Sequence, residues 1–239
     1  MSIILIFIIT FIIIFITALY IYAKSKARFG DKKSIKKYIT KLNDVTITKL
    51  GKDNLVYKGP NTKAAFIFYP GAFIDQYAYE PLMALLAHKG IMCVICKSSP
   101  FLFFFENNYS DGIKNKFPEI KNWYIGGHSL GGICSSYYAS KQLNDFKGLI
   151  FLGAYTFFNL IDSKLKVLSI YGSEDKVLNM KRYEKYKSSL PSDLTEFVIE
   201  DGCHSYFGMY GIQSGDGTPK ISNKEQIEIT ADKISQWIN

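Results

Sequence analysis

The sequence has little cysteine and little net charge outside one short segment, and each shortage excludes a class of protein. Its 4 cysteines form no framework of closely spaced pairs, so disulfide stapling is not expected. Of the net charge of +8, residues 24–37 carry +6, which leaves only +2 over residues 38–239. A nucleic-acid-binding domain would spread basic charge over its folded surface, so no nucleic acid partner is expected. With 48% apolar and 21% charged residues, the chain is neither disordered nor collagen-like.

The first 23 residues contain no charged side chain, and residues 3–23 are apolar apart from two threonines and two tyrosines. A helix of this length would span about 31 Å, close to the thickness of a bilayer core. A cleaved signal peptide places its positive charge before a shorter apolar stretch, whereas here the basic residues follow it. We therefore predict a transmembrane anchor over residues 1–23 and a basic juxtamembrane linker over 24–44. The positive-inside rule places the body in the cytoplasm, with the extracellular side left open.

From about residue 45 to residue 239 the chain is predicted to form one domain in which short strands alternate with helices. The strands are expected at residues 45–48, 55–58, 64–69, 91–96, 122–125, 148–152, 167–171 and 196–200. The helices are expected at residues 77–89, 132–142, 181–188 and 223–237. Such alternation predicts an α/β fold, a mostly parallel sheet with helices on both faces.

The segment GGHSLGG holds the pattern G-x-S-x-G, with Ser129 at its centre. A predicted strand runs into the segment and a helix rich in small residues runs out of it. In this strand–turn–helix setting, a nucleophile elbow, glycines permit a tight turn that lifts the serine hydroxyl above the sheet edge. The N-terminus of the helix favours developing negative charge. We predict Ser129 to be a nucleophile rather than part of a helix start without chemistry.

A serine nucleophile needs a base, and the positions of the three histidines separate them. His128 adjoins Ser129, and its side chain should diverge from the hydroxyl. His88 ends a predicted helix that precedes a strand, which puts it at the opposite end of the sheet. His204 lies in the loop DGCHSYFG after a strand, at the end where such folds bind ligands. His204 is therefore the predicted base.

The third group of such a site is a carboxylate that fixes the imidazole tautomer. Asp175 directly follows the strand VLSIY, in the loop before the one that carries His204. Glu174 competes for this role, and Asp201 is close to His204 in sequence. A helix N-cap is the other interpretation of Asp175. Loop position and chain order favour Asp175 as the acid.

Acyl transfer also requires an oxyanion hole. One donor is expected to be the backbone N–H of Leu130, directly after the nucleophile. The second is expected from the loop after the first buried strand, where Gly71 lets the backbone approach a substrate. Ala72 N–H is the favoured donor and Phe73 the fallback, although Pro-Gly also suits an ordinary turn.

These segments resemble the α/β-hydrolase superfamily, in the branch near dienelactone hydrolase, or carboxymethylenebutenolidase. The resemblance runs from about residue 63 to 222. It rests on FYPGAFIDQYAYEPLMALLAHKG, GGHSLGG, YGSEDKV and IEDGCHSYFGMYGIQSGDG. It implies the superfamily fold, with nucleophile, acid and base in the chain order Ser129, Asp175 and His204. It also implies oxyanion donors at Leu130 and Ala72.

Two positions depart from that branch. Pro70 stands where many members have a histidine before the glycine. This difference affects which residue supplies the second oxyanion donor, and not the fold. Ser129 stands where dienelactone hydrolase has a cysteine, which favours ordinary ester hydrolysis. The expected protein is a membrane-anchored serine hydrolase that cleaves small-molecule or lipid-like carboxylic esters through an acyl-enzyme. A thioesterase, an amide hydrolase and a non-catalytic binding module of the same fold are the competing hypotheses. No metal cluster or phosphate-cradling loop is visible, so no cofactor is expected.

Three further features of the sequence concern the aromatic run, the cysteines and Asp216. The aromatic run PFLFFF, residues 100–105, could wall an acyl pocket or belong to the core. Cys93 and Cys96 should point to opposite faces of one strand, so neither zinc binding nor redox use is expected of this pair. Cys203 is expected to be a packed thiol, and Asp216 has no predicted role.

Overall fold

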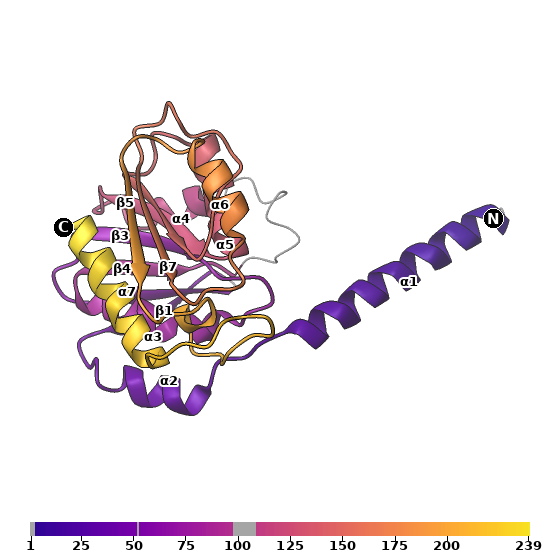
Figure 1. Ribbon diagram of the computed structural model, residues 1–239, viewed down its shortest axis with the longest axis horizontal. Coiled ribbons are helices and arrows are strands. Elements are labelled where there is room, and N and C mark those ends of the chain that lie inside the picture. The colour runs from indigo at the N-terminus through magenta and orange to yellow at the C-terminus, as the bar shows by residue number, and fades with distance from the viewer. Residues whose placement is uncertain (1–2, 52, 98–108) are drawn as a thin grey trace.

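A computed structural model describes residues 3–51, 53–97 and 109–239, which form an 8-stranded sheet with helices on both faces (Figure 1). The strands are β1 (Thr46–Leu50), β2 (Asn54–Lys58), β3 (Ala64–Tyr69), β4 (Ile91–Ile95), β5 (Trp123–His128), β6 (Gly148–Leu152), β7 (Lys166–Gly172) and β8 (Leu194–Ile199). They lie in the order β1-β2-β4-β3-β5-β6-β7-β8. β2 is antiparallel to β1 and β4, and the other pairs are parallel, so the predicted mostly parallel sheet is confirmed.

The helices supply the two outer layers and one projecting segment. They are α1 (Ile3–Lys26), α2 (Lys32–Ile39), α3 (Glu80–His88), α4 (Tyr109–Lys114), α5 (Leu130–Lys141), α6 (Met180–Lys187) and α7 (Asn223–Ile238). Two short 3₁₀ turns, η1 (Gln76–Tyr79) and η2 (Ser205–Phe207), precede α3 and α7. α3 and α7 pack on one face of the sheet, and α5 packs on the other.

The apolar run of β3 shows why the sheet is buried on both faces. Phe66 and Phe68 point into the cluster beneath α3 and α7, while Ala65 and Ile67 point into the cluster beneath α5. Successive side chains of a strand face opposite sides, so an uninterrupted apolar strand needs a helical layer on each side. The four side chains are completely buried. Burying a large apolar side chain contributes roughly 1.5–3 kcal/mol, so these layers hold the strand ends in fixed positions.

Two helices begin two or more residues away from their predicted starts, and the other predicted helix ends agree within one residue. The helix expected at residues 77–89 is a 3₁₀ turn followed by an α-helix that begins at Glu80. Pro81 lies in the first turn of α3, where its missing N–H has no intrahelical partner to lose. α5 begins at Leu130, two residues before the predicted start, because the turn at Ser129 leads directly into the helix.

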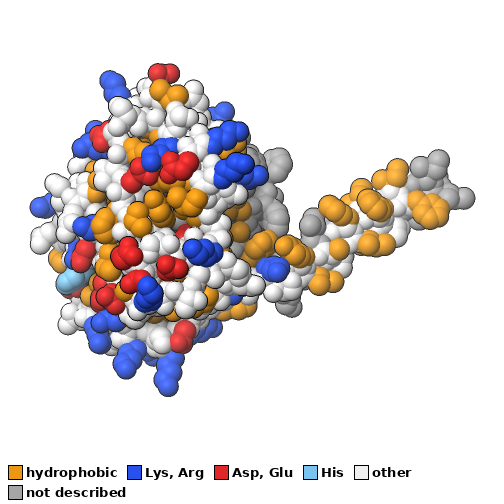
Figure 2. Space-filling model, in the orientation of Figure 1, with side chains coloured by type: hydrophobic (Ala, Val, Ile, Leu, Met, Phe, Trp, Pro, Cys, Tyr) orange, Lys and Arg blue, Asp and Glu red, His pale blue; other side chains and the backbone are white. Residues whose placement is uncertain are grey.

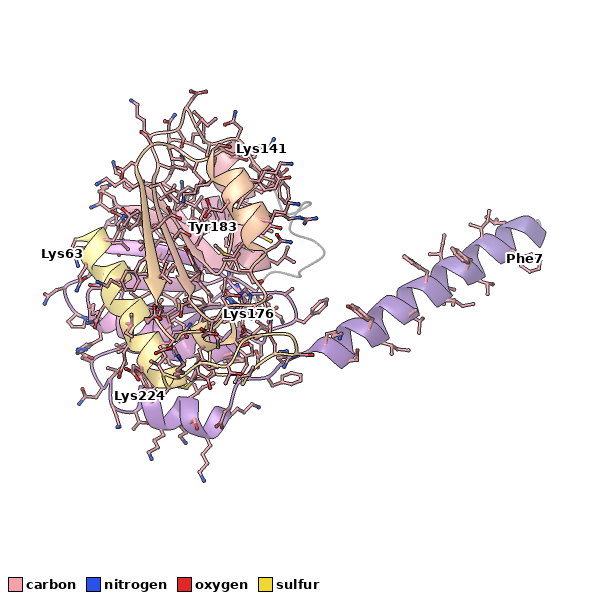
Figure 3. The ribbon with its side chains drawn as sticks, in the orientation of Figure 1. Phe7, Lys63, Lys141, Lys176, Tyr183 and Lys224 are labelled. Carbon is pink, nitrogen blue, oxygen red and sulfur yellow. The ribbon has the colours of Figure 1, made fainter. Side chains whose placement is uncertain are left out.

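α1 runs away from the folded body, and its described apolar side chains are exposed (Figures 1 and 2). Phe7, near the far end (Figure 3), and Phe11 are each 71% exposed. Among the described residues no helix has both the length and the apolar character required to cross a membrane. The predicted transmembrane helix is therefore not supported. The segment predicted as a linker contains α2, which is capped by Asp31 and buries Ile35.

Candidate active site

Ser129 occupies the turn between β5 and α5, with φ 53° and ψ −122°. A positive φ is unfavourable for a residue with a side chain, so the surrounding contacts must hold this turn. Its N–H donates to the carbonyl of Leu152 at 2.9 Å. A Cβ on Gly131 would lie 2.1 Å from the carbonyl oxygen of Tyr69, and one on Gly127 would lie 2.5 Å from the same atom. These glycines therefore let the turn and the end of β3 come together.

His204 and Asp175 form a buried pair after β8 and β7. The Nδ1 atom of His204 lies 2.8 Å from Oδ2 of Asp175, and both side chains are nearly inaccessible to solvent. The other carboxylate oxygen accepts hydrogen bonds from the N–H groups of Val177 and Leu178, at 2.9 and 2.8 Å. Asp175 thus caps the chain that follows it and also orients the imidazole.

Neither competing carboxylate is a partner of His204 in the described structure. Asp201 instead pairs with Lys220 at 2.9 Å. Glu174 uses its backbone, donating its N–H to Gly202 at 2.8 Å.

Gly153, at the end of β6, makes room for the buried pair. It has φ 53°, and a Cβ there would lie 2.8 Å from Nδ1 of His204 and 3.0 Å from Oδ2 of Asp175. A side chain would therefore press between the two groups. The sequence offered no signal for this residue, because the contact joins three separate loops.

A pocket of about 230 Å³ lies between the turn at Ser129 and the loop after β8 that carries His204, which we call the histidine loop. Its lining includes Ser129, Leu130, Ile133, Val177, Leu178 and His204. Among the described contacts no hydrogen bond links Ser129 to His204. Catalytic hydrogen bonds are often long in the absence of substrate and tighten when it binds. The pocket is therefore a place where a substrate carbonyl could reach both side chains.

Of the two backbone donors expected for an oxyanion, Leu130 lies directly at this turn. Leu130 is the first residue of α5, where a helix leaves its N–H groups without intrahelical acceptors. The loop after β3 approaches the same helix start, because Gly131 packs against the carbonyls of Tyr69 and Pro70. Ala72 and Phe73 follow in this loop, and Phe73 has φ 60°.

His128 lies beneath the site and points inward. Its Nδ1 atom is 2.8 Å from the hydroxyl of Tyr79, which accepts the N–H of Gly71 at 3.1 Å. Burial, with a smaller effect of His204, lowers the pKa of His128 well below its usual value, so the ring is neutral. Its ring centroid is 4.5 Å from that of His204. His128 therefore supports the floor of the site, which the sequence did not indicate.

The third histidine lies elsewhere. His88, at the end of α3, is half exposed and has its Nδ1 atom 2.8 Å from a carboxylate oxygen of Asp44. It borders a surface pocket with Lys63 and Asn122, residues that precede β3 and β5, at the end of the sheet opposite Ser129.

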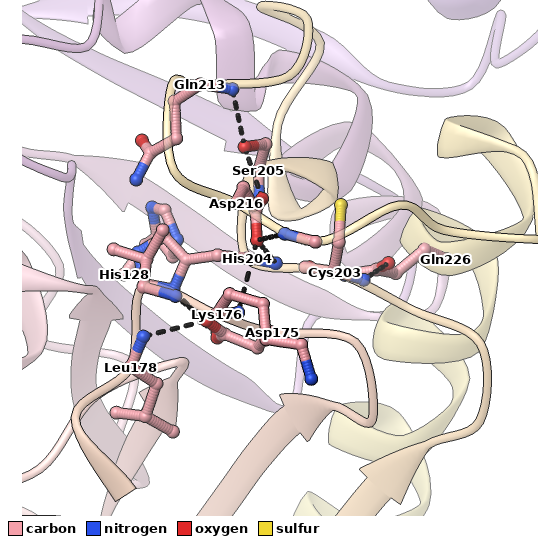
Figure 4. Close-up of polar contacts among 12 residues, drawn as sticks. His128, Asp175, Lys176, Leu178, Cys203, His204, Ser205, Gln213, Asp216 and Gln226 are labelled. Atoms are coloured by element: carbon pink, nitrogen blue, oxygen red, sulfur yellow. Dashed lines mark hydrogen bonds and ion pairs between the residues drawn. The ribbon is translucent and has the colours of Figure 1, made fainter.

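Asp216, which had no predicted role, holds the histidine loop (Figure 4). It accepts hydrogen bonds from the N–H groups of His204, Ser205 and Gly217 at 3.2, 2.7 and 2.8 Å, and from the Ser205 hydroxyl at 2.6 Å. The N–H of Lys176, beside the acid, is 3.5 Å away. Burial would raise the pKa of Asp216, but these hydrogen bonds outweigh it and lower the pKa below its usual value. Asp216 therefore connects the loop that carries Asp175 to the loop that carries His204.

A second clamp reaches the same loop from α7. Gln226, completely buried, accepts the N–H of Cys203 at 2.9 Å and donates to its carbonyl at 2.7 Å. Burial raises the pKa of the Cys203 thiol to about 12, so it remains protonated. Cys203 is thus a packed thiol beside the base.

The remaining expectations concern metals, the C-x-x-C pair and the aromatic run. Cys93 and Cys96 belong to the clusters on opposite faces of the sheet, as predicted. In the part of the chain that the structure describes, no group of His, Cys, Asp and Glu could hold a metal ion. The run at residues 100–105 lies outside the described residues.

Together the fold and the site define an α/β protein with a serine at a strand–turn–helix junction beside a buried histidine–carboxylate pair. Residues 65–228, more than half of the chain, match the family described as the alpha/beta hydrolase family. The chain belongs to the alpha/beta hydrolase family. No curated protein matches it.

Two solved structures share its fold. Est1E from Butyrivibrio proteoclasticus is 11% identical, with a TM-score of 0.57 over 82% of this chain and 97% of that one. A protein described as a predicted CIB-like hydrolase from Thermoplasma acidophilum is 13% identical, with a TM-score of 0.54 over 80% of this chain and 99% of that one. At these identities the likeness extends to the fold alone.

Proposed function

We propose that the protein is a serine hydrolase that cleaves carboxylic esters through Ser129, His204 and Asp175. The observation that carries the proposal is the buried His204–Asp175 pair, with 2.8 Å between Nδ1 and Oδ2. His204 lines the same pocket as Ser129. A neutral imidazole held by a carboxylate at Nδ1 presents Nε2 as a base. Membership of the hydrolase family and the strained serine turn support the same reaction.

In the proposed mechanism the Ser129 hydroxyl oxygen attacks the ester carbonyl carbon while Nε2 of His204 takes its proton. Asp175 stabilises the imidazolium that forms. The N–H groups of Leu130 and Ala72 donate to the carbonyl oxygen as it becomes an oxyanion. His204 then gives its proton to the departing alcohol, which leaves an acyl group on Ser129. A water molecule, deprotonated by His204, releases the acid and restores the serine.

Reaction with a fluorophosphonate probe tests this proposal. We expect Ser129 to be labelled in the folded protein, and Ser129→Ala to lose both labelling and ester hydrolysis. Unfolding the wild-type protein should also abolish labelling. A folded wild-type protein that neither reacts with the probe nor hydrolyses esters would favour a non-catalytic binding module. A panel of matched esters, thioesters and amides distinguishes an esterase from a thioesterase and an amide hydrolase, because one triad can serve all three.

The pocket suggests the size of the acyl group. A volume of about 230 Å³, with Ile133, Val177 and Leu178 among its lining, suits a short apolar chain. Each buried methylene contributes about 0.8 kcal/mol, or roughly fourfold in kcat/KM. We expect kcat/KM to rise over the first few acyl carbons and then fall, and Leu178→Ala to move the maximum to longer chains. A steady fall from acetyl onward would contradict an acyl-binding role for this pocket.

We further propose that α1 associates with a lipid surface and that the folded domain lies on the cytoplasmic side. Support comes from its exposed apolar side chains, such as those of Phe7 and Phe11, and from the basic residues that follow it. Apolar side chains exposed along a whole helix are stabilised by a lipid environment, and basic residues by anionic headgroups.

A further inference from the structure

The chain that follows α1 pairs with the loop after β3. We call residues 28–31 the strap and residues 70–75 the β3 loop. Arg28 donates its N–H to the carbonyl of Phe73 at 2.8 Å, and its carbonyl accepts the N–H of Asp75 at 2.8 Å. These two bonds form a parallel bridge between Arg28 and Ile74. The β3 loop is therefore held by a segment that is distant from it in the sequence.

The far end of the strap is fixed to the segment that follows His204. Asp31 donates its N–H to the carbonyl of Met209 at 2.9 Å. The N–H of Met209 donates to the carbonyl of Ala78 at 2.7 Å. Gly30 lies between these contacts, and a Cβ there would be 2.6 Å from Ile35 and 3.1 Å from the backbone of Ala78. The strap is thus packed into the body and is not a loose connection to α1.

The β3 loop has an unfavourable backbone conformation that contacts with the strap can stabilise. Phe73 has φ 60°, which is unfavourable for a bulky side chain and persists only where the surroundings impose it. The strap bonds Phe73 and Asp75, on either side of Ile74. At the inner end, Gly71 is fixed by its bond to the Tyr79 hydroxyl. The backbone of Ala72 therefore lies between two anchored ends.

We propose that the strap is a positioning element for the oxyanion hole, with the main chain of Arg28 fixing the β3 loop so that the Ala72 N–H meets the substrate oxygen. This proposal rests on the proposed hydrolase function. Oxyanion stabilisation depends on donors that are already in place. Moving the donors during the reaction would cost free energy and offset the stabilisation of the transition state. The ring of Tyr22, on α1, lies edge-on to Phe73 with centroids 6.1 Å apart. The root of α1 therefore touches the same loop.

Two matched pairs of variants in the full chain test the strap. Asp75→Pro removes the N–H that bonds to Arg28, and the native φ of −59° already suits proline. Asp75→Ala keeps that N–H and, like the proline, loses the side-chain bond to Tyr77. Arg28→Pro and Arg28→Ala form the second pair, since only the proline loses the N–H that bonds to Phe73. Each difference within a pair isolates one backbone hydrogen bond.

We expect kcat for ester hydrolysis to be about 10- to 100-fold lower in each proline variant than in its alanine counterpart, with KM changed less than threefold, because an oxyanion donor acts in the transition state. Affinity for a trifluoromethyl ketone, which forms a tetrahedral adduct, should fall in parallel. Circular dichroism and thermal unfolding check that each variant folds. If one proline variant fails to fold, the other pair decides.

Hydrogen exchange of the β3 loop amides provides a readout that needs no turnover. The loop should exchange at least tenfold faster in the proline variants than in the alanine variants. Equal exchange and equal kcat within both pairs would overturn the proposal, as would faster exchange with unchanged kcat. If the wild-type protein hydrolyses no ester and binds no ketone, the oxyanion role fails with the proposed function. If hydrogen exchange still differs within the pairs in that case, the strap does restrain the β3 loop, and the proposed hydrolase function is the part that is wrong.

Discussion

At the scale of single residues, Gly153 decides whether the His204 imidazole and the Asp175 carboxylate can meet. The three residues come from different loops, and the space between them is too small for a methyl group. Glycine is also suited to the backbone here, because φ is 53°. One missing side chain thus serves both the turn and the buried pair.

Gly153→Ala is expected to lower kcat/KM by about 10³-fold, since separating the imidazole from its carboxylate removes most of the effect of the acid. The control is Gly51→Ala, at a position with φ 64° and nothing within 4 Å of a new Cβ. It introduces similar backbone strain far from the site and should leave kcat/KM within about twofold. Steady-state kinetics on a p-nitrophenyl ester compare the two. Equal effects would mean that strain, and not contact with the pair, limits position 153.

A second pair of variants tests which of two neighbouring carboxylates, Asp175 or Glu174, is the acid that orients His204. Asp175→Asn keeps the shape of the side chain but favours the wrong tautomer of His204, so kcat should fall by about 10⁴-fold. Glu174→Gln should change kcat by less than about threefold, because the described Glu174 contact is through its backbone. The reverse pattern would assign the acid role to Glu174.

At the scale of elements, the histidine loop between β8 and α7 is held from two sides. Asp216 binds the amides of His204 and Ser205, and Gln226 binds both backbone groups of Cys203. Asp216 is half-buried, and a carboxylate with several donors is costly to neutralise or remove, because its partners are left unsatisfied. The placement of the base therefore depends on a residue that follows it by 12 positions in the sequence.

Asp216→Asn should lower the free energy of unfolding by about 2 kcal/mol at pH 7. The folded-state pKa of Asp216 lies below the ordinary value of 3.8. Its carboxylate therefore stabilises the fold above about pH 4, and this contribution disappears as the pH falls through the folded-state pKa. The difference in unfolding free energy between wild type and Asp216→Asn should shrink between pH 7 and pH 3. Urea titrations at each pH measure it, and a constant difference would contradict the proposed charge-dependent clamp.

At the scale of the whole molecule, α1 and the folded domain contribute different properties. The site residues all lie after residue 70, whereas α1 exposes its apolar side chains away from the body. The strap separates the two, because residues 28–31 belong to the folded body through their backbone bonds. Removal of α1 should therefore be tolerated by the site only if the strap is kept.

A chain beginning at residue 27 should lose binding to vesicles that contain anionic lipid and should keep kcat on p-nitrophenyl acetate within about threefold. A chain beginning at residue 32 should also lose vesicle binding, with kcat lowered about tenfold or more because the strap is absent. Vesicle flotation and steady-state kinetics measure the two effects. Vesicle binding by the shorter chains would contradict the proposed role of α1.

Local patterns were sufficient to predict much of the fold and several candidate site positions. The strand AAFIFY is buried on both faces, as its uninterrupted apolar side chains indicated. The turn around Ser129 could be predicted because glycines, a preceding strand and a following helix adjoin one another in the sequence. His204 and Asp175 were selected by loop order, since parallel strands deliver successive loops to the same edge.

The sequence by itself determined the strands, most of the helices (α2 and α4 were not predicted) and the edge of the sheet on which they converge, because periodicity and turn residues act over a few neighbouring positions. Only the tertiary structure decided how that edge is held: the space left by Gly153, the clamp of Asp216, the inward-facing His128 and the strap from Arg28 to the β3 loop. Each of these contacts joins residues that are distant in the chain. Their distances are fixed by packing of the whole sheet and its helices, and no local pattern encodes them.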